Sequence, residues 1–188
     1  MTVTVTAVVL CGGGSIRFGA DKTRQPLGET TVLGHLVDSL PLDWSVVAVG
    51  TPRPLEREVT WSREDPPGGG PLAGIAAGVR GVTTDVVVVI AGDMPFAGPW
   101  AARLVDTLAA APATNAVTAR DGDQRPNPLL TAYRTDALRE ALPHDPAGGS
   151  ARLLLQAIAH EGMLVPDEES LDVDTPEALE AARHRLGP

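Results

Sequence analysis

The chain has 188 residues, of which 43% are hydrophobic, and it carries a formal net charge of −9. This composition predicts a folded protein with a single domain over residues 1–188 and excludes a disordered chain. The acidic balance argues against nucleic acid and anionic membranes as partners, and six aromatic residues are too few for a surface that stacks single-stranded bases.

The cysteine content and the N-terminal residues exclude further classes of protein. Cys11 is the only cysteine, so the chain can form neither an internal disulfide nor a cysteine-based zinc site. The first six residues alternate like a strand, without the basic start and apolar block of a signal peptide. No apolar run approaches the roughly 20 residues that a membrane span requires. We therefore expect a soluble cytoplasmic protein.

Short apolar runs alternate with segments of helical periodicity, a pattern typical of βαβ units and a mostly parallel sheet. In the first half of the chain, the sequence predicts a strand over 3–10, a helix over 31–40, strands over 45–50 and 58–61, a helix from 70 to 78 or 80, and a strand over 85–91. In the second half, it predicts a helix over 98–110, strands over 113–119 and 128–133, and helices over 135–142 and 150–159. A strand over 162–165 and a helix over 175–186 complete the chain. Ser150 is a candidate cap for the helix that follows it, and Pro176 suits the first turn of the last helix.

A glycine-rich segment follows the first strand, where residues 8–22 read V-V-L-C-G-G-G-S-I-R-F-G-A-D-K. Consecutive glycines let backbone amides approach a polyphosphate closely, and Arg17 and Lys22 can neutralise its charge. The spacing does not fit a P-loop, because Ala20 and Asp21 separate the second glycine from Lys22. It does not fit the dinucleotide fingerprint either, which needs a glycine where Arg17 stands. Asp21 is expected to pair with a neighbouring cation.

Two aspartates are expected at the same edge of the sheet as this segment, because ligands of open α/β sheets bind at the carboxyl ends of the strands. Asp93 ends the most apolar strand, and Met94-Pro95 fixes the chain direction after it. A rigidly aimed carboxylate suits Mg²⁺, which takes one or two carboxylates and completes its shell with phosphate oxygens. Asp174 precedes the last helix, where it can act as an N-cap or as a ligand.

The glycine-rich segment resembles the signature loop of nucleotidyltransferases with a Rossmann-like fold, and is most similar to that of the molybdenum cofactor guanylyltransferase family. Three later segments agree in order: G-P-L-A-G at 70–74, G-D-M-P-F at 92–96 and D-V-D-T-P-E at 172–177. The resemblance implies a three-layer α/β fold with a mostly parallel twisted sheet flanked by helices. It also implies a Mg²⁺-dependent transfer of GMP from GTP to molybdenum-molybdopterin, with release of pyrophosphate.

The resemblance also implies a set of site residues. The catalytic residues are Arg17, Lys22 and Asp93; the nucleotide-binding residues are Leu10, Cys11, Gly12, Gly13, Gly14, Lys22, Asp65, Gly70, Leu72 and Asp93; the metal ligands are Asp93 and Asp174; and the residues on the pterin side are Asn127, Asp172 and Asp174. The family usually has two asparagines where this chain has Asp172 and Asp174. That change adds two negative charges, which can strengthen metal binding or weaken binding of a phosphate-bearing substrate.

The sequence leaves alternatives open for several of these site residues. Asp65 can accept hydrogen bonds from a guanine, but Glu64 competes for that role and a surface salt bridge with Arg63 or Arg57 is equally open. Asn127 stands between two prolines, where it can simply form a stiff turn. For the whole protein, the alternatives are transfer from CTP to the same cofactor, guanylyl transfer to phospholactate, and a non-catalytic nucleotide-binding protein that helps to load molybdoenzymes.

Overall fold

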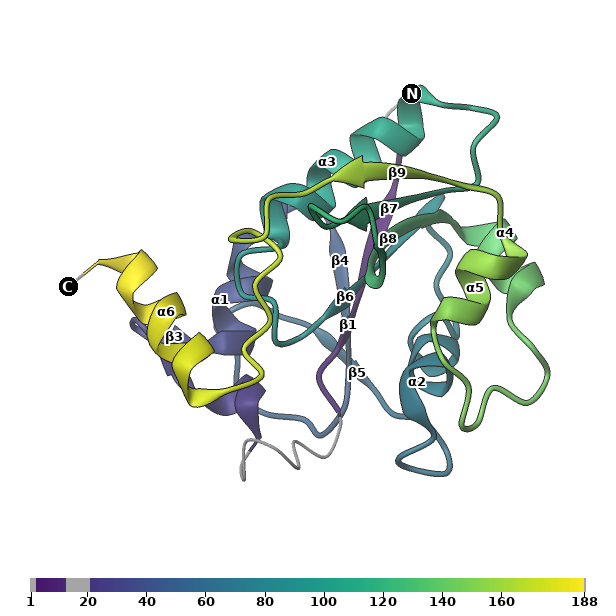
Figure 1. The fold of residues 1–188 in the computed structure, drawn as a ribbon. Helices are drawn as coiled ribbons and strands as arrows, with labels where there is room; N and C mark the ends of the chain where they lie inside the picture. Colours follow the sequence, from purple (N-terminus) through teal and green to yellow (C-terminus); the bar gives the residue numbers. More distant parts are fainter. Residues whose placement is uncertain (1–2, 13–20, 188) are drawn as a thin grey trace.

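The computed structural model describes residues 3–12 and 21–187, which form a seven-stranded sheet with helices on both faces (Figure 1). The strand order is β5-β4-β1-β6-β8-β7-β9. The strands of this sheet are β1 (Val5–Leu10), β4 (Ser45–Val49), β5 (Thr60–Ser62), β6 (Val86–Ala91), β7 (Ala116–Arg120), β8 (Pro126–Arg134) and β9 (His160–Leu164). The predicted α/β class with a mostly parallel sheet is confirmed.

The parallel half of the sheet is built around β1, which lies between β4 and β6. Every residue of β6 is buried, in keeping with its unbroken apolar sequence. β8 then runs antiparallel to both β6 and β7, while β9 returns parallel to β7. Because β1, β4 and β6 run in the same direction, their carboxyl ends meet at one edge of the sheet.

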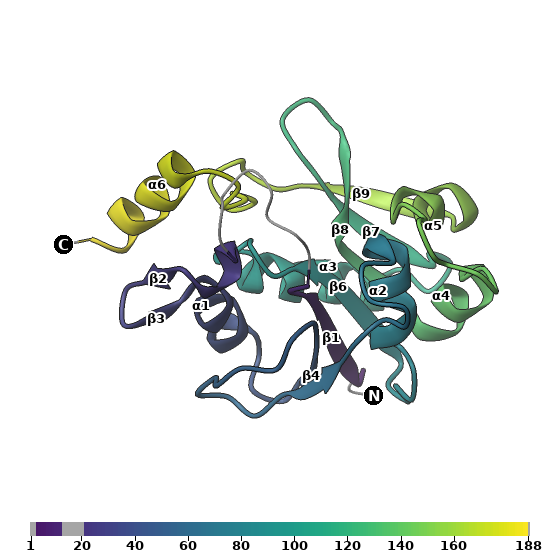
Figure 2. The same ribbon diagram turned by 90° about the horizontal axis from the view of Figure 1, so that it is seen from below.

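Two groups of helices cover the two faces (Figures 1 and 2). One face packs against α1 (Val32–Ser39) and α3 (Gly98–Ala110), whose buried residues include Leu36 and Leu104. The other face packs against α2 (Gly70–Gly78), α4 (Thr135–Ala141) and α5 (Arg152–Ala157), with Ile75 and Leu154 among their buried residues. The result is the three-layer arrangement that the family resemblance implies. None of the described helices is long and apolar enough to cross a lipid bilayer.

A smaller apolar cluster joins the last helix, α6 (Pro176–Leu186), to a short hairpin that the sequence does not predict. The hairpin consists of β2 (Pro26–Leu27) and β3 (Thr30–Thr31), turning at Gly28, whose φ is +60°. Two-residue strands are too short to show a period of two. The cluster contains Leu27 from the hairpin, Phe96 after β6 and Leu179 from α6.

Several predicted boundaries need correction. β7 begins at Ala116 rather than at 113, and β8 begins at Pro126 because it pairs with β7 as far as the turn. α5 begins at Arg152, with Ala151 in the N-cap position. The hydroxyl of Ser150 accepts a hydrogen bond from the amide of Arg152, so Ser150 orders the approach to α5 without being its N-cap.

Candidate active site

The ends of β1, β4 and β6 are joined by backbone hydrogen bonds just beyond the last paired residues. The amide of Cys11 donates to the carbonyl of Val49 (3.0 Å), and the amide of Gly92 donates to the carbonyl of Leu10 (2.8 Å). Leu10, Cys11 and the start of the glycine-rich segment therefore lie between the segments that follow β4 and β6. Cys11 itself is buried, and its thiol donates to the same Val49 carbonyl.

Gly50 permits this close approach. A Cβ at Gly50 would lie 2.9 Å from the amide nitrogen of Gly12 and 3.0 Å from the carbonyl oxygen of Cys11. Both obstacles are backbone atoms, and the φ of Gly50 is +154°, which disfavours any other residue. The start of the glycine-rich segment is thus held in van der Waals contact with the end of β4.

We expect Gly50→Ala to lower the free energy of unfolding by about 2–3 kcal/mol, because the added methyl group must push two backbone segments apart. Urea unfolding followed by circular dichroism would measure this. Gly81→Ala is the matched control: its φ is +81°, but no atom lies within 4 Å of the added Cβ. Its loss should be about 1 kcal/mol, from backbone strain alone. Equal losses in the two variants would contradict the role assigned to the close contact.

Lys22 and two aspartates form the charged centre of the site. Lys22 begins a short 3-10 helix, η1 (Lys22–Arg24), and its ammonium group forms ion pairs with the carboxylates of Asp93 and Asp174. The side chains of Lys22 and Asp93 are 22% and 12% exposed, whereas that of Asp174 is 54% exposed. Partial burial lowers the pKa of Lys22, but its hydrogen bonds to the two carboxylates outweigh this and raise the pKa above its ordinary value.

A backbone hydrogen bond holds the segment that carries Asp172 and Asp174 next to Asp93. Asp93 follows β6, and its carbonyl accepts a hydrogen bond from the amide of Val173 (2.9 Å). Asp172 and Asp174 flank Val173, so three carboxylates lie near the single ammonium group of Lys22. Surrounding protein, together with the charges of Asp93 and Asp174, raises the pKa of Asp172 to about 7. Asp172 itself is exposed to solvent.

Asp174 is not the N-cap of the last helix. That position is held by Thr175, whose hydroxyl accepts a hydrogen bond from the amide of Ala178 (3.2 Å). The carboxylate of Asp174 is drawn instead to Lys22. The structure therefore leaves Asp174 available for a role in the site.

The donors at this place fit a hard divalent cation. The carboxylates of Asp93 and Asp174 both contact the ammonium group of Lys22, so they lie close together. Mg²⁺ is commonly bound by one or two carboxylates together with substrate phosphates. No group of three or more potential ligands close enough to hold an ion by themselves occurs within residues 3–12 and 21–187.

The predicted base-recognition residues lie in the loop before α2 and in the first turn of α2, which is tied to a second loop. The amide of Leu72 donates to the carbonyl of Gly149 (3.3 Å), and the side chain of Leu72 is buried. Glu64 accepts a hydrogen bond from the amide of Gly68, whereas Asp65 is exposed and forms no ion pair with any described arginine. Nucleotide contacts of Asp65, Leu72 and the half-buried Gly70 stay predictions.

Asn127 lies beside the segment that carries Asp93. Its side-chain amide is 3.9 Å from the sulfur of Met94, and its side-chain oxygen accepts from the amide of Leu129 (2.9 Å). Its carbonyl also accepts from the hydroxyls of Thr118 and Thr131. Asn127 thus lies within β8, paired with Ala119 at an irregularity in the register, and not in a stiff turn; a contact with the pterin stays a prediction. Gly13, Gly14 and Arg17 lie outside the described residues.

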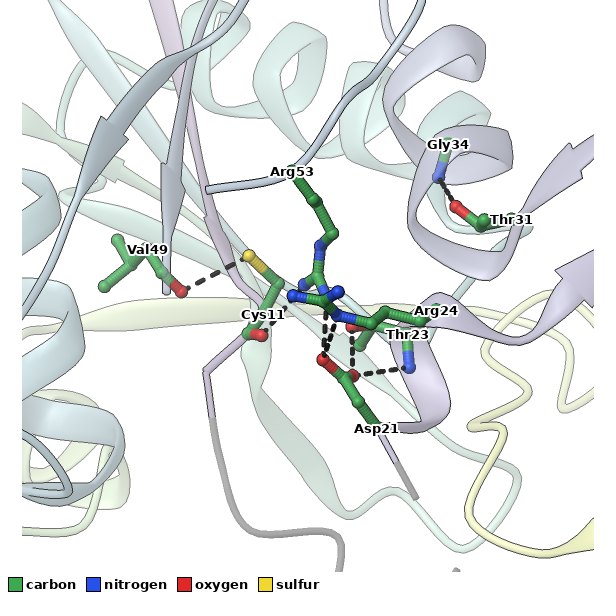
Figure 3. A network of polar contacts seen from close by, with 8 residues as sticks. All are labelled: Cys11, Asp21, Thr23, Arg24, Thr31, Gly34, Val49 and Arg53. Carbon is green, nitrogen blue, oxygen red and sulfur yellow. Dashed lines mark hydrogen bonds and ion pairs between the residues drawn. The ribbon is translucent and has the colours of Figure 1, made fainter. Parts of the chain in front are cut away.

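Sequence reasoning assigned no role to Arg53, although it lies at the centre of a polar network beside the glycine-rich segment (Figure 3). Its guanidinium donates to the carboxylate of Asp21 (2.7 Å) and to the carbonyl of Cys11 (3.1 Å). The expectation that Asp21 pairs with a cation is confirmed. An isolated arginine in a Pro-rich stretch gives no periodic or motif signal, so only the tertiary structure reveals this residue.

Known proteins resemble this chain in sequence and in fold. The family model of the MobA-like NTP transferase domain matches residues 7–162. The chain belongs to this family. A MobA-like relative from Mycobacterium avium (strain 104), a probable molybdenum cofactor guanylyltransferase, is 32% identical, with 96% of this chain and 95% of the relative covered.

Solved structures share the MobA-like fold over nearly the whole chain. The molybdopterin-guanine dinucleotide biosynthesis protein A of Archaeoglobus fulgidus superposes with a TM-score of 0.71 at 22% identity, covering 97% of this chain and 98% of that one. The manganese complex of a protein from Mycobacterium tuberculosis H37Rv superposes with a TM-score of 0.73 at 19% identity, covering 98% and 100% of the two chains. Both similarities establish the nucleotidyltransferase fold.

Proposed function

We propose that the protein transfers GMP from GTP to the terminal phosphate of molybdenum-molybdopterin, with release of pyrophosphate. The observation that carries the proposal is the placement of Lys22 on Asp93 and Asp174, beside the ends of β1, β4 and β6. A centre of one ammonium group and several carboxylates suits a triphosphate with its divalent cation. The guanylyltransferase relatives supply the base and the acceptor.

The reaction needs positioning and charge neutralisation more than a protein nucleophile. An oxygen of the acceptor phosphate forms the new bond to the α-phosphorus of GTP, while the bond from that phosphorus to the bridging oxygen breaks. A phosphate monoester has its second pKa near 6, so it is already ionised near neutral pH and requires no general base. Lys22 would turn from the aspartates towards the phosphates and stabilise their charge.

Asp93 and Asp174 would hold Mg²⁺, which would supply positive charge to neutralise the phosphates. The proposal of a divalent ion is supported by the carboxylate donors and by the manganese complex of the protein that shares the fold. Two carboxylates in place of the family's usual amides increase the negative charge here, which favours a cation further.

Pyrophosphate release tests the reaction, the base and the acceptor together. Purified protein would be given Mg²⁺ and molybdenum-loaded molybdopterin, with GTP, CTP, ATP and UTP in separate reactions. We expect release with GTP alone, and only when the pterin is present. Release with CTP would place the protein among the cytidylyltransferases, and no release from protein that binds GTP would favour another acceptor or a non-catalytic role.

A further inference from the structure

Arg53 is buried at the edge of the sheet where the proposed site lies. It follows β4 by four residues, and its side chain is only 6% exposed. Figure 3 shows its guanidinium between Cys11 and Asp21. Nothing in the proposed reaction uses it, so its position requires a separate explanation.

One guanidinium joins two points that are ten residues apart in the chain. Nη1 donates to a carboxylate oxygen of Asp21 (2.7 Å), and Nη2 donates to the carbonyl oxygen of Cys11 (3.1 Å). Cys11 directly precedes Gly12 and Asp21 directly precedes Lys22. The planar group therefore fixes the distance between the two described ends of the glycine-rich sequence, which a flexible ammonium group cannot do.

Asp21 passes this constraint on to Lys22. Its other carboxylate oxygen accepts from the amide (3.1 Å) and the hydroxyl (2.6 Å) of Thr23, so Asp21 is the N-cap of η1. With both oxygens engaged, the carboxylate cannot rotate without breaking the cap. Movement of Arg53 would thus shift the backbone of Lys22, and with it the position of the Lys22 side chain.

The burial of Arg53 is poorly compensated, which argues against a purely stabilising role. Its Nε is buried and has no hydrogen-bond partner among the described residues, an arrangement that costs stability. The ring of Trp61, 5.9 Å away, offsets little of this. Arg57 offers a contrast, since its guanidinium donates four hydrogen bonds, to the carbonyls of Val37, Leu40, Pro41 and Trp44.

We propose that Arg53 is a positioning residue for the triphosphate, which holds Lys22 in place relative to Gly12 through its paired contacts with Asp21 and Cys11. This inference rests on the proposed function, because it takes Gly12 and Lys22 to be the phosphate-binding groups. It predicts that Arg53 affects the phosphates of the ligand and not its base.

The test compares the affinities for GTP and for guanosine in the presence of Mg²⁺. Calorimetry measures GTP binding, and displacement of GTP measures guanosine binding. Arg53→Gln should weaken GTP binding about tenfold or more and change guanosine binding less than about twofold. Arg53→Lys should recover only part of the loss, because one ammonium group cannot keep both contacts. Arg57→Gln is the matched control: it should lose thermal stability while the folded protein keeps its GTP affinity.

A double-mutant cycle with Lys22→Ala gives a readout that a structural role would not move. If Arg53 acts through Lys22, removal of Lys22 should weaken GTP binding less in the Arg53→Gln protein than in the wild type. Additive losses would overturn the inference, as would unchanged GTP affinity in Arg53→Gln or equal losses for GTP and guanosine. A wild-type protein that binds GTP no better than guanosine would instead overturn the proposed function itself, and this inference with it.

Discussion

Asp93→Asn is expected to lower kcat/KM for GMP transfer by about 100- to 1,000-fold while the protein remains folded. Asp93 is the most buried of the three site carboxylates and the only one at the end of the central strand β6. The asparagine side chain has the same shape as that of aspartate but carries no negative charge. In the free protein that charge pairs with Lys22, and in the reaction it would hold a divalent cation. Steady-state pyrophosphate release over a range of Mg²⁺ concentrations measures the loss, with circular dichroism as the check on folding.

Asp174→Asn is the matched comparison for this experiment. The substitution restores the asparagine that is usual in the family that the sequence resembles. The side chain of Asp174 is 54% exposed. We expect a far smaller loss, of about tenfold or less, since an exposed charge is screened by water. If Asp174→Asn were as damaging as Asp93→Asn, the two carboxylates would be equal ligands. If Asp93→Asn kept wild-type turnover, Asp93 would have no part in the mechanism.

Lys22→Ala should have two separate effects, one on catalysis and one on the stability of the free protein. Loss of the cation that we propose faces the triphosphate should reduce kcat/KM by about 100- to 1,000-fold. In the absence of ligand, the carboxylates of Asp93 and Asp174 lose their shared counter-charge. We expect the free energy of unfolding to fall by about 1–3 kcal/mol, less than for a fully buried pair because Asp174 is exposed.

Urea unfolding and pyrophosphate release, made on the same protein samples, measure the two effects of Lys22→Ala. Arg24→Ala serves as the control, because Arg24 is half exposed and its partner Asp21 keeps the contact with Arg53. It should leave both quantities close to wild type. Equal behaviour of the two variants would mean that Lys22 is an ordinary surface cation.

The sequence was sufficient for the features that depend on local pattern. The apolar run of β6 and the aspartate that ends it predict both a central strand and the position of Asp93. Helices on both faces follow from the alternation of apolar runs with helical periodicity. The meeting of Lys22 and Asp93 also follows, since the carboxyl ends of parallel strands share one edge.

Features that depend on tertiary contacts could not be predicted in the same way. Arg53 contacts residues 32 and 42 positions away, and no spacing rule connects them. Asp174 and Thr175 are both good N-cap residues, and the choice between them is decided by Lys22, which is 152 positions from Asp174. The hairpin β2–β3 exists because Leu27 packs against α6, not because of its own pattern.

The contact between Val173 and the backbone of Asp93 has a consequence for how the chain can be divided. The matched domain ends at residue 162, inside β9, whereas Asp172, Asp174 and α6 all come after it. A protein shortened to that boundary would keep β1, β4 and β6 but lose the carboxylate that shares Lys22 with Asp93. It would also uncover Leu27 and Phe96. The final 26 residues thus supply part of the proposed site, and the limits of the matched domain are not the limits of the charged centre around Lys22.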